Sequence, residues 1–227
     1  MNWNKIKGII FDYGGTLDSR GVHWSEVIWA GWQRAAVAVT KEQFREAYVH
    51  AERALAKSPI ILPEDNFLEL MRKKVKIELE FLGIFTPERC ESIARYCYDS
   101  ARECVEESRP VLEALSARYP LVLVSNFYGN VSAVLSDFDL LRYFPRIIES
   151  AVVGVRKPDP AIFRLGVEAL GLPAEEVLVV GDSLKKDILP AESIGCQTAW
   201  IKGKGWTADE DAQTHPSQIP SLSSLLQ

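Results

Sequence analysis

The chain has 227 residues, of which 47% are hydrophobic and 25% charged, and its formal net charge is −5. This length suits one domain with an insertion, and the apolar content is sufficient for a large core. The negative charge argues against a nucleic-acid partner, because binding to nucleic acid rewards clustered Lys and Arg.

The sequence gives no sign of a membrane or secretory segment. No apolar run is long enough to span a bilayer, and the first residues lack the apolar stretch of a signal peptide. Cys90, Cys97 and Cys104 recur every seven residues, which puts them on one helical stripe, so we interpret them as buried packing residues. Unbridged thiols are typical of a reducing compartment, so we expect a cytoplasmic protein without a membrane partner.

The first predicted strand, 8–11, is followed by Asp12-Tyr13-Gly14-Gly15-Thr16. Roughly a hundred residues precede the next strand, far more than a crossover needs. This interval has helical patterns at 23–37, 41–57, 64–82 and 87–107, the last of which begins with Thr86 as N-cap and Pro87 at the first helical position. We therefore predict an all-helical cap at 19–107, a lid over a core made of 1–18 and 108–227.

The remaining elements predict the architecture of that core. Continuous apolar runs at 121–125, 147–153, 177–180 and 198–201 indicate strands covered on both faces. Helical patterns lie between or before them at 109–118, 131–137, 161–170 and 185–194, and Leu222, Leu225 and Leu226 suggest a final helical turn. This alternation favours the α/β class, with a Rossmann-like doubly wound parallel sheet.

Polar residues follow several of these strands. Asp12, Ser125 and Asp182 each lie at a predicted carboxyl end, and Lys157 lies just past the third strand. Ligands of such sheets bind beyond the carboxyl ends of the strands, so we predict the functional site there. In isolation, Asp12 is equally typical of a nucleophile, a metal ligand or the cap of a turn.

Four short motifs carry a family resemblance. They are F-D-Y-G-G-T-L-D at 11–18, V-S-N at 124–126, R-K-P-D-P-A-I-F at 156–163 and G-D-S-L-K-K-D at 181–187. In this order and spacing they resemble the haloacid dehalogenase superfamily with a helical cap inserted after the first motif. The resemblance covers most of the chain. It implies a Rossmann-like fold and a magnesium-dependent phosphatase with an aspartyl-phosphate intermediate.

The resemblance also implies roles for individual residues. Asp12 matches the nucleophile, and a carboxylate that attacks phosphorus divides hydrolysis into two easier displacements. Asp12, Asp182 and the backbone carbonyl of Gly14 match ligands of Mg²⁺, which prefers oxygen donors. Asp187 either supports the metal or orients Lys157. A simple first-turn acid of the following helix explains Asp187 equally well.

Other matched positions concern the phosphoryl group. Ser125 and Lys157 match the hydroxyl and the ammonium that hold it, and Asn126 completes the same motif as a substrate-side residue. Thr16 matches a hydroxyl that helps to fix the first loop, where an ordinary turn hydrogen bond has nearly the same effect.

Gly14 departs from the family pattern, because phosphatases of the family have a second Asp there that protonates the leaving group. Such assistance is typically worth ~10²–10⁴-fold. Asp18 and His23 are the candidate replacements, although a turn role for Asp18 and a packing role for His23 weigh more. His23 titrates near neutral pH and begins the cap, which places it among the candidate substrate-binding residues.

The sequence thus predicts a magnesium-dependent hydrolase of a small phosphorylated metabolite, altered in some way by Gly14. One alternative is carbon–halogen hydrolysis, which uses an Asp nucleophile without magnesium. The other is a ligand-binding or regulatory protein on a catalytically degenerate scaffold.

Overall fold

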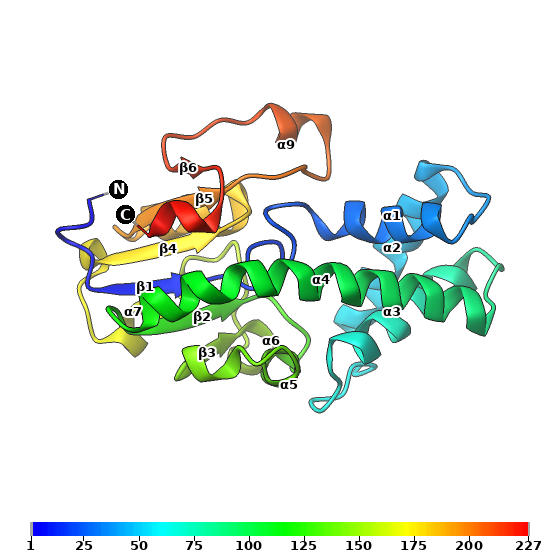
Figure 1. Cartoon of the computed structure of the whole chain (residues 1–227), viewed down its shortest axis with the longest axis horizontal. Coiled ribbons are helices and arrows are strands. Elements are labelled where there is room, and N and C mark those ends of the chain that lie inside the picture. Colours follow the sequence, from blue (N-terminus) through cyan, green and yellow to red (C-terminus); the bar gives the residue numbers. More distant parts are fainter. Residues whose placement is uncertain (1, 227) are drawn as a thin grey trace.

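A computed structural model describes residues 2–226 and shows a single parallel sheet in its core (Figure 1). Its order is β3-β2-β1-β4-β5-β6, and every neighbouring pair is parallel. The strands are β1 (Gly8–Phe11), β2 (Leu121–Ser125), β3 (Arg146–Glu149), β4 (Val177–Gly181), β5 (Gln197–Ile201) and β6 (Gln218–Ile219). The α/β, Rossmann-like prediction is confirmed.

Helices cover both faces of this sheet, because side chains alternate between the faces along each strand. Ile9 and Phe11 pack into one apolar cluster, and Ile10 packs into the other. The first cluster contains residues of α5 (Val131–Asp137), η1 (Leu141–Tyr143) and η4 (Leu222–Leu225); the second contains residues of α7 (Ala161–Leu170) and α8 (Leu189–Ser193). The η4 turn confirms the helical turn predicted near the end of the chain.

Four helices between β1 and β2 extend beyond one end of the sheet (Figure 1). They are α1 (Trp24–Arg34), α2 (Lys41–Lys57), α3 (Phe67–Phe81) and α4 (Pro87–Ser116). Thr40 and Asn66 form capping boxes that begin α2 and α3, and Thr86 caps α4 as predicted. Cys90, Cys97 and Cys104 are buried free thiols on α4, in agreement with the packing interpretation.

The prediction of separate helices at 87–107 and 109–118 is wrong, because α4 runs without interruption through both. Pro110 lies inside the helix and removes one backbone donor there. The buried stripe nevertheless continues to Leu112 and Leu115. Ser108 donates a hydrogen bond of 2.9 Å to the carbonyl of Leu17, which helps to hold this region. The proposed division at 107–108 therefore falls within a continuous helix.

Two other predicted elements differ from the structure. The strand expected at 147–153 ends at Glu149, and α6 (Ser150–Val153) follows; the Glu149 carboxylate accepts backbone N–H groups of Gly129 and Val131, which ties the strand end to a neighbouring loop. The helix expected at 185–194 is divided into a π-helical turn, η3 (Leu184–Ile188), and α8. The π turn forms because the carbonyl of Ser183 accepts the N–H groups of both Asp187 and Ile188.

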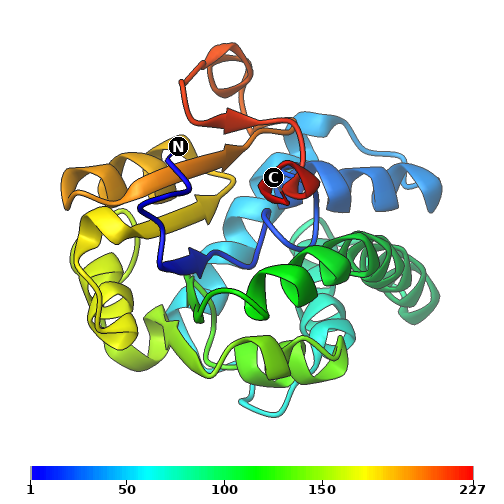
Figure 2. The same cartoon turned by 60° about the vertical axis from the view of Figure 1, so that its left-hand side comes forward.

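Short elements complete the chain. The 3-10 turn η2 (Ala174–Glu176) precedes β4, and α9 (Ala208–Ala212) lies in the excursion between β5 and β6, seen at the top of Figure 2. Within residues 2–226, no helix combines the length and apolar composition needed to cross a bilayer.

A buried carboxyl group in α3 gives a prediction about stability. The Glu78 side chain is fully buried, and within residues 2–226 no group has hydrogen-bond geometry to either of its oxygens. Burial raises its pKa to about 8, while the charge of Lys74 opposes this shift. Because the folded pKa lies above the unfolded one, the free energy of unfolding should fall as the pH rises from about 4.5 to about 8.

We expect Glu78→Gln to be more stable than the wild type at pH 9 by a few kcal/mol, and to lose this advantage below pH 5. Urea unfolding at both pH values measures the difference. Glu80→Gln, which changes an exposed acid on the same helix, is the control. An advantage of Glu78→Gln that is equal at both pH values would contradict the buried neutral carboxyl.

Candidate functional site

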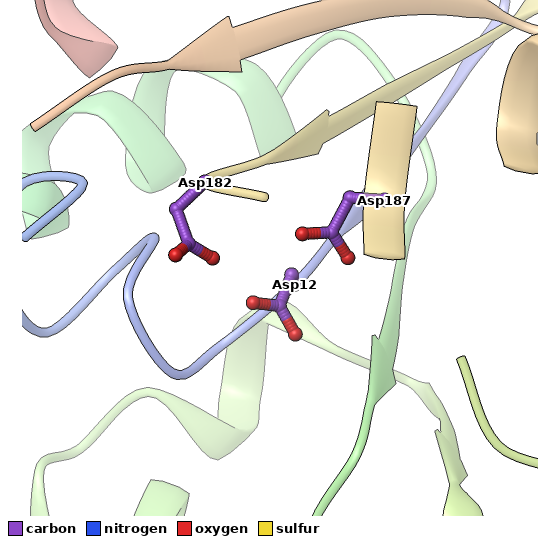
Figure 3. Close-up of side chains that lie close together, drawn as sticks. All are labelled: Asp12, Asp182 and Asp187. Carbon is purple, nitrogen blue, oxygen red and sulfur yellow. The ribbon is translucent and has the colours of Figure 1, made fainter. Parts of the chain in front are cut away.

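The candidate site lies where β1, β2 and β4 end, because these neighbouring parallel strands release their last residues at one edge of the sheet. Asp12 directly follows β1, Ser125 ends β2 and Asp182 directly follows β4. Asp187 comes from η3, which begins just after Asp182. Figure 3 shows the carboxylates of Asp12, Asp182 and Asp187 converging on one small space.

Lys157 binds two of these carboxylates. Its Nζ donates to Asp12 Oδ1 and to Asp187 Oδ1, each at 2.6 Å, and its side chain is only 2% exposed. Burial alone would lower the pKa of Lys157, but the charges of Asp12 and Asp187 raise it. The lysine is therefore a fixed cation beside Asp12. Asn126 positions its backbone, because the Asn126 amide side chain bonds both the N–H and the carbonyl of Lys157.

Hydroxyl groups complete the surroundings of Asp12. Ser125 Oγ donates to Asp12 Oδ1, and Thr16 Oγ1 donates to Asp12 Oδ2, both at 3.2 Å. Asp12 itself is 6% exposed. Every acceptor atom of this buried carboxylate therefore has a donor, and the side chain is held in one orientation.

The three carboxylates together carry more negative charge than the buried Lys157 beside them can neutralise. Ligand oxygens of Asp12, Asp182 and Asp187 lie within 4.8 Å of one another. Burial raises the pKa of Asp182, and the charges of Asp187 and Asp12 raise it further; burial also raises the pKa of Asp187, although Lys157 opposes that shift. A divalent cation would offset this excess of negative charge. Clustered hard oxygen donors of this kind fit Mg²⁺.

The loop after Asp12 is held by Asp18, in agreement with the turn role that the sequence favoured for this residue. Asp18 accepts hydrogen bonds from the N–H of Gly15 at 2.7 Å and from the Trp24 indole at 3.1 Å. Gly15 has a φ of 95°, and a Cβ there would lie 2.4 Å from the Asp182 carboxylate. Burial raises the pKa of Asp18 to about 7. Asp18 thus anchors the loop to the start of the cap, a role that its place in the first motif alone does not reveal.

Gly14 has neither of the constraints that act on Gly15. Its φ lies outside the left-handed region, and an added Cβ would have no atom within 4 Å. Gly14 also lines the cavity above Asp12. A side chain at this position is therefore sterically permitted.

His23 is the N-cap of α1, where its Nδ1 accepts the N–H of Ser25. Its ring centroid lies 6.0 Å from that of Tyr48 and 5.4 Å from that of Trp206. Burial lowers its pKa to about 4, and Lys186 lowers it further, so the ring is neutral at neutral pH. His23 lines the cavity, but capping and packing account for its contacts. Its role toward a substrate stays a prediction.

A cavity of about 830 Å³ lies above the carboxylates. Its lining includes the three carboxylates, Lys157, Ser125, Asn126 and several side chains of the helical cap, but not Thr16. The polar lining residues that the sequence did not reveal include Tyr48, Glu52 and Lys74 from the cap and Tyr128 from the core. Their inward orientation depends on how α2 and α3 pack, and each residue alone is typical of a helix surface or loop.

Comparison with known proteins identifies the family to which the chain belongs. A family model described as haloacid dehalogenase-like hydrolase matches residues 6–195. The "haloacid dehalogenase-like hydrolase domain-containing protein 3" of Danio rerio is 33% identical over 59% of this chain and 55% of its own length. A phosphoserine phosphatase of Thermus thermophilus is 29% identical over 51% of this chain and 48% of its own. The chain thus spans about half the length of these two curated relatives.

A solved structure shares the fold over nearly the whole chain. The HAD-hydrolase YfnB of Bacillus subtilis, described as bound to magnesium, superimposes with a TM-score of 0.59 at 19% identity, covering 97% of this chain and 96% of its own. At this identity the likeness concerns the fold alone. The family model, by contrast, matches most of the chain, and so the chain belongs to the haloacid dehalogenase-like hydrolases.

Proposed function

We propose that this hydrolase is magnesium-dependent and acts on a small phosphorylated metabolite through an aspartyl-phosphate at Asp12. The observation that carries the proposal is the environment of Asp12, a buried carboxylate held by Lys157, Ser125 and Thr16 beside two further acids. Curated relatives named as phosphatases of phosphoserine, phosphoglycolate and glyceraldehyde 3-phosphate support the substrate class.

In the first step a carboxylate oxygen of Asp12 bonds to phosphorus, and the bond from phosphorus to the leaving oxygen breaks. Lys157 and Ser125 stabilise the charge that develops on the phosphoryl oxygens. In the second step water attacks phosphorus, which releases phosphate and restores the Asp12 carboxylate. Asp12, Asp182 and Asp187 would hold Mg²⁺, with the carbonyl of Gly14 as a further ligand. The bound ion would neutralise charge on the phosphoryl group.

The missing acid at Gly14 limits this chemistry to certain leaving groups. A carboxylate or phenolate leaves without a proton, whereas an alkoxide needs one. His23 is neutral and packed as an N-cap, and Asp18 is occupied with the loop. We therefore expect acyl and aryl phosphates to react faster than alkyl phosphates, as a screen of phosphate release with and without Mg²⁺ would measure. Faster reaction of alkyl phosphates would indicate a substitute acid.

Carbon–halogen hydrolysis is a second candidate, because Gly14 stands where phosphatases of the family have an acid. In that reaction Asp12 forms an ester, and water attacks the carboxyl carbon, so ¹⁸O from solvent enters Asp12. In the phosphoryl reaction water attacks phosphorus, so ¹⁸O enters phosphate. Mass spectrometry of the Asp12 peptide after repeated turnover in ¹⁸O water separates the two. The acidic cluster favours the phosphoryl reaction, because a halide displacement has no need of three carboxylates around a cation.

Removal of one acid tests the metal site. We expect Mg²⁺ to raise the melting temperature of the wild type and to have no such effect on Asp182→Ala, because this variant loses a ligand. Titration calorimetry gives the affinity directly. Asp99→Ala removes an exposed acid on α4 and is the control. An unchanged magnesium affinity in Asp182→Ala would remove the metal assignment.

A further inference from the structure

A second polar group lies on the cap side of the cavity. It comprises Glu52 on α2, Lys74 on α3, Tyr48 on α2 and Tyr128 after β2, and we call it the cap cluster. The other cap residues that line the cavity include apolar side chains such as Leu70 and Met71. A few convergent polar groups in an apolar wall are typical of sites that fix the orientation of a ligand.

Lys74 is the buried cation of this cluster. Its side chain is 4% exposed, it forms an ion pair with Glu52, and its Nζ lies 4.3 Å from the centroid of the Tyr48 ring. Although burial alone would lower the pKa of Lys74, the charge of Glu52 helps to raise it. The lysine therefore stays charged and keeps Glu52 ionised in turn.

Glu52 presents the free acceptor. Its side chain is 37% exposed while it lines the cavity. Tyr128 Oη lies 3.1 Å from Oε1 and 3.2 Å from Oε2, and its single hydroxyl hydrogen is shared between them. Lys74 binds Oε1, so Oε2 has only this shared donor. A carboxylate oxygen accepts more than one hydrogen bond, and Oε2 therefore has capacity for a donor from the cavity.

The surrounding charges restrict which donor fits. The basic residues that line the same cavity, apart from Lys157, are Arg53, Lys57, Lys74, Arg156, Lys185, Lys186 and Lys202, and Glu210 lines it too. Lys186 helps to lower the pKa of Glu52, and Arg156 acts in the same direction on Tyr128. An ammonium donor would be repelled by these cations, and an ionised carboxylate has no hydrogen to donate to Glu52. A neutral hydroxyl can donate to Glu52 Oε2 without that repulsion.

We propose that Glu52 determines specificity by accepting a hydrogen bond from a hydroxyl in the leaving group of the substrate. The proposal rests on the proposed phosphatase function and narrows its substrates to small phosphorylated compounds whose leaving group carries free hydroxyl groups. Lys74 and Tyr128 act through Glu52 as positioning residues, since they hold the acceptor at the cavity wall.

The test compares polyol phosphates with propyl phosphate, from which glycerol phosphate differs only in its hydroxyl groups. For the wild type we expect a kcat/KM at least tenfold higher for the best of glycerol, erythritol and ribitol phosphates than for propyl phosphate, since a hydrogen bond to a charged group is worth about 1.5–3 kcal/mol. Glu52→Ala should lower kcat/KM for the polyol phosphate at least about tenfold more than it lowers kcat/KM for propyl phosphate. Glu46→Ala, an exposed acid on the same helix, should change none of these values.

Further variants guard against loss of folding, because Glu52→Ala leaves the buried Lys74 without its partner. Glu52→Gln retains an acceptor and should keep the melting temperature closer to wild type while it loses part of the discrimination. Tyr128→Phe should weaken the discrimination while acetyl phosphate turnover persists. Equal discrimination by wild type and folded Glu52→Ala, or by wild type and the Glu52→Ala/Lys74→Met double variant if the single variant does not fold, would overturn the proposal.

Other outcomes distinguish failure of this specificity proposal from failure of the proposed phosphatase function. If the wild type hydrolyses acetyl phosphate but does not distinguish polyol phosphates from propyl phosphate, the specificity proposal fails and the phosphatase function stands. A preference for phosphoethanolamine or phosphoglycolate over every polyol phosphate would also overturn it, since ammonium or carboxylate recognition would then prevail. Failure to release phosphate from any of these compounds removes both proposals.

Discussion

Asp12→Asn is expected to lower phosphate release from acetyl phosphate by at least about a thousandfold, because loss of a covalent nucleophile is among the costliest single changes in an enzyme. The amide is nearly isosteric with the carboxylate but is a poor nucleophile. Lys157 keeps Asp187 as its partner in this variant, so the fold should persist. Steady-state assays with saturating Mg²⁺ give the rate, and circular dichroism checks folding.

Asp99→Asn is the matched control, since it makes the same chemical change at an exposed position on α4. Its rate should equal that of the wild type. If folded Asp12→Asn retained even a tenth of wild-type turnover, Asp12 could not be the nucleophile, and another group in the cavity would have to be sought.

Gly14→Asp is expected to raise kcat/KM for alkyl phosphates, by up to ~10²-fold, the lower end of general acid–base assistance. The backbone permits the substitution, because φ at Gly14 lies outside the left-handed region and the Cβ meets open space. The new carboxyl would protonate the departing alkoxide and then activate water. Assays with propyl and glycerol phosphates measure the gain.

The control for this gain is Gly14→Asn, which has similar size but cannot transfer the proton. Acetyl phosphate is the control substrate, because its leaving group needs no acid in the first step. A folded, magnesium-binding Gly14→Asp protein with no gain on any alkyl phosphate would contradict the missing-acid account. That result would favour either a substitute acid elsewhere in the site or a protein without catalytic function.

The residues at the strand ends of the candidate site could be predicted from the sequence, because the topology of the sheet determines their positions. Asp12, Ser125 and Asp182 follow apolar runs that could only be buried parallel strands, and such strands end at one edge of the sheet. The structure brings these residues together with Lys157, which is 145 residues from Asp12 in the chain. Their catalytic roles remain predictions.

The cap residues that line the cavity could not be predicted in this way. Glu52 and Lys74 lie on different helices, and only the packing of α2 against α3 makes them partners. Likewise, the two helices predicted at 87–107 and 109–118 are one, because burial continues along α4. Local signals determined where most helices begin, whereas side-chain pairing between helices depended on tertiary contacts that leave no periodic pattern.

The central claim is that Asp12 carries the phosphoryl group, and trapping that group tests it most directly. Wild-type protein is mixed with acetyl phosphate and Mg²⁺, quenched in acid and reduced with borohydride, which converts an acyl phosphate to an alcohol. We predict homoserine at position 12 by peptide mass spectrometry, absent when Mg²⁺ is chelated. Rapid phosphate release with an unmodified Asp12 at every quench time, together with a borohydride-reduced side chain at another residue, would contradict the account.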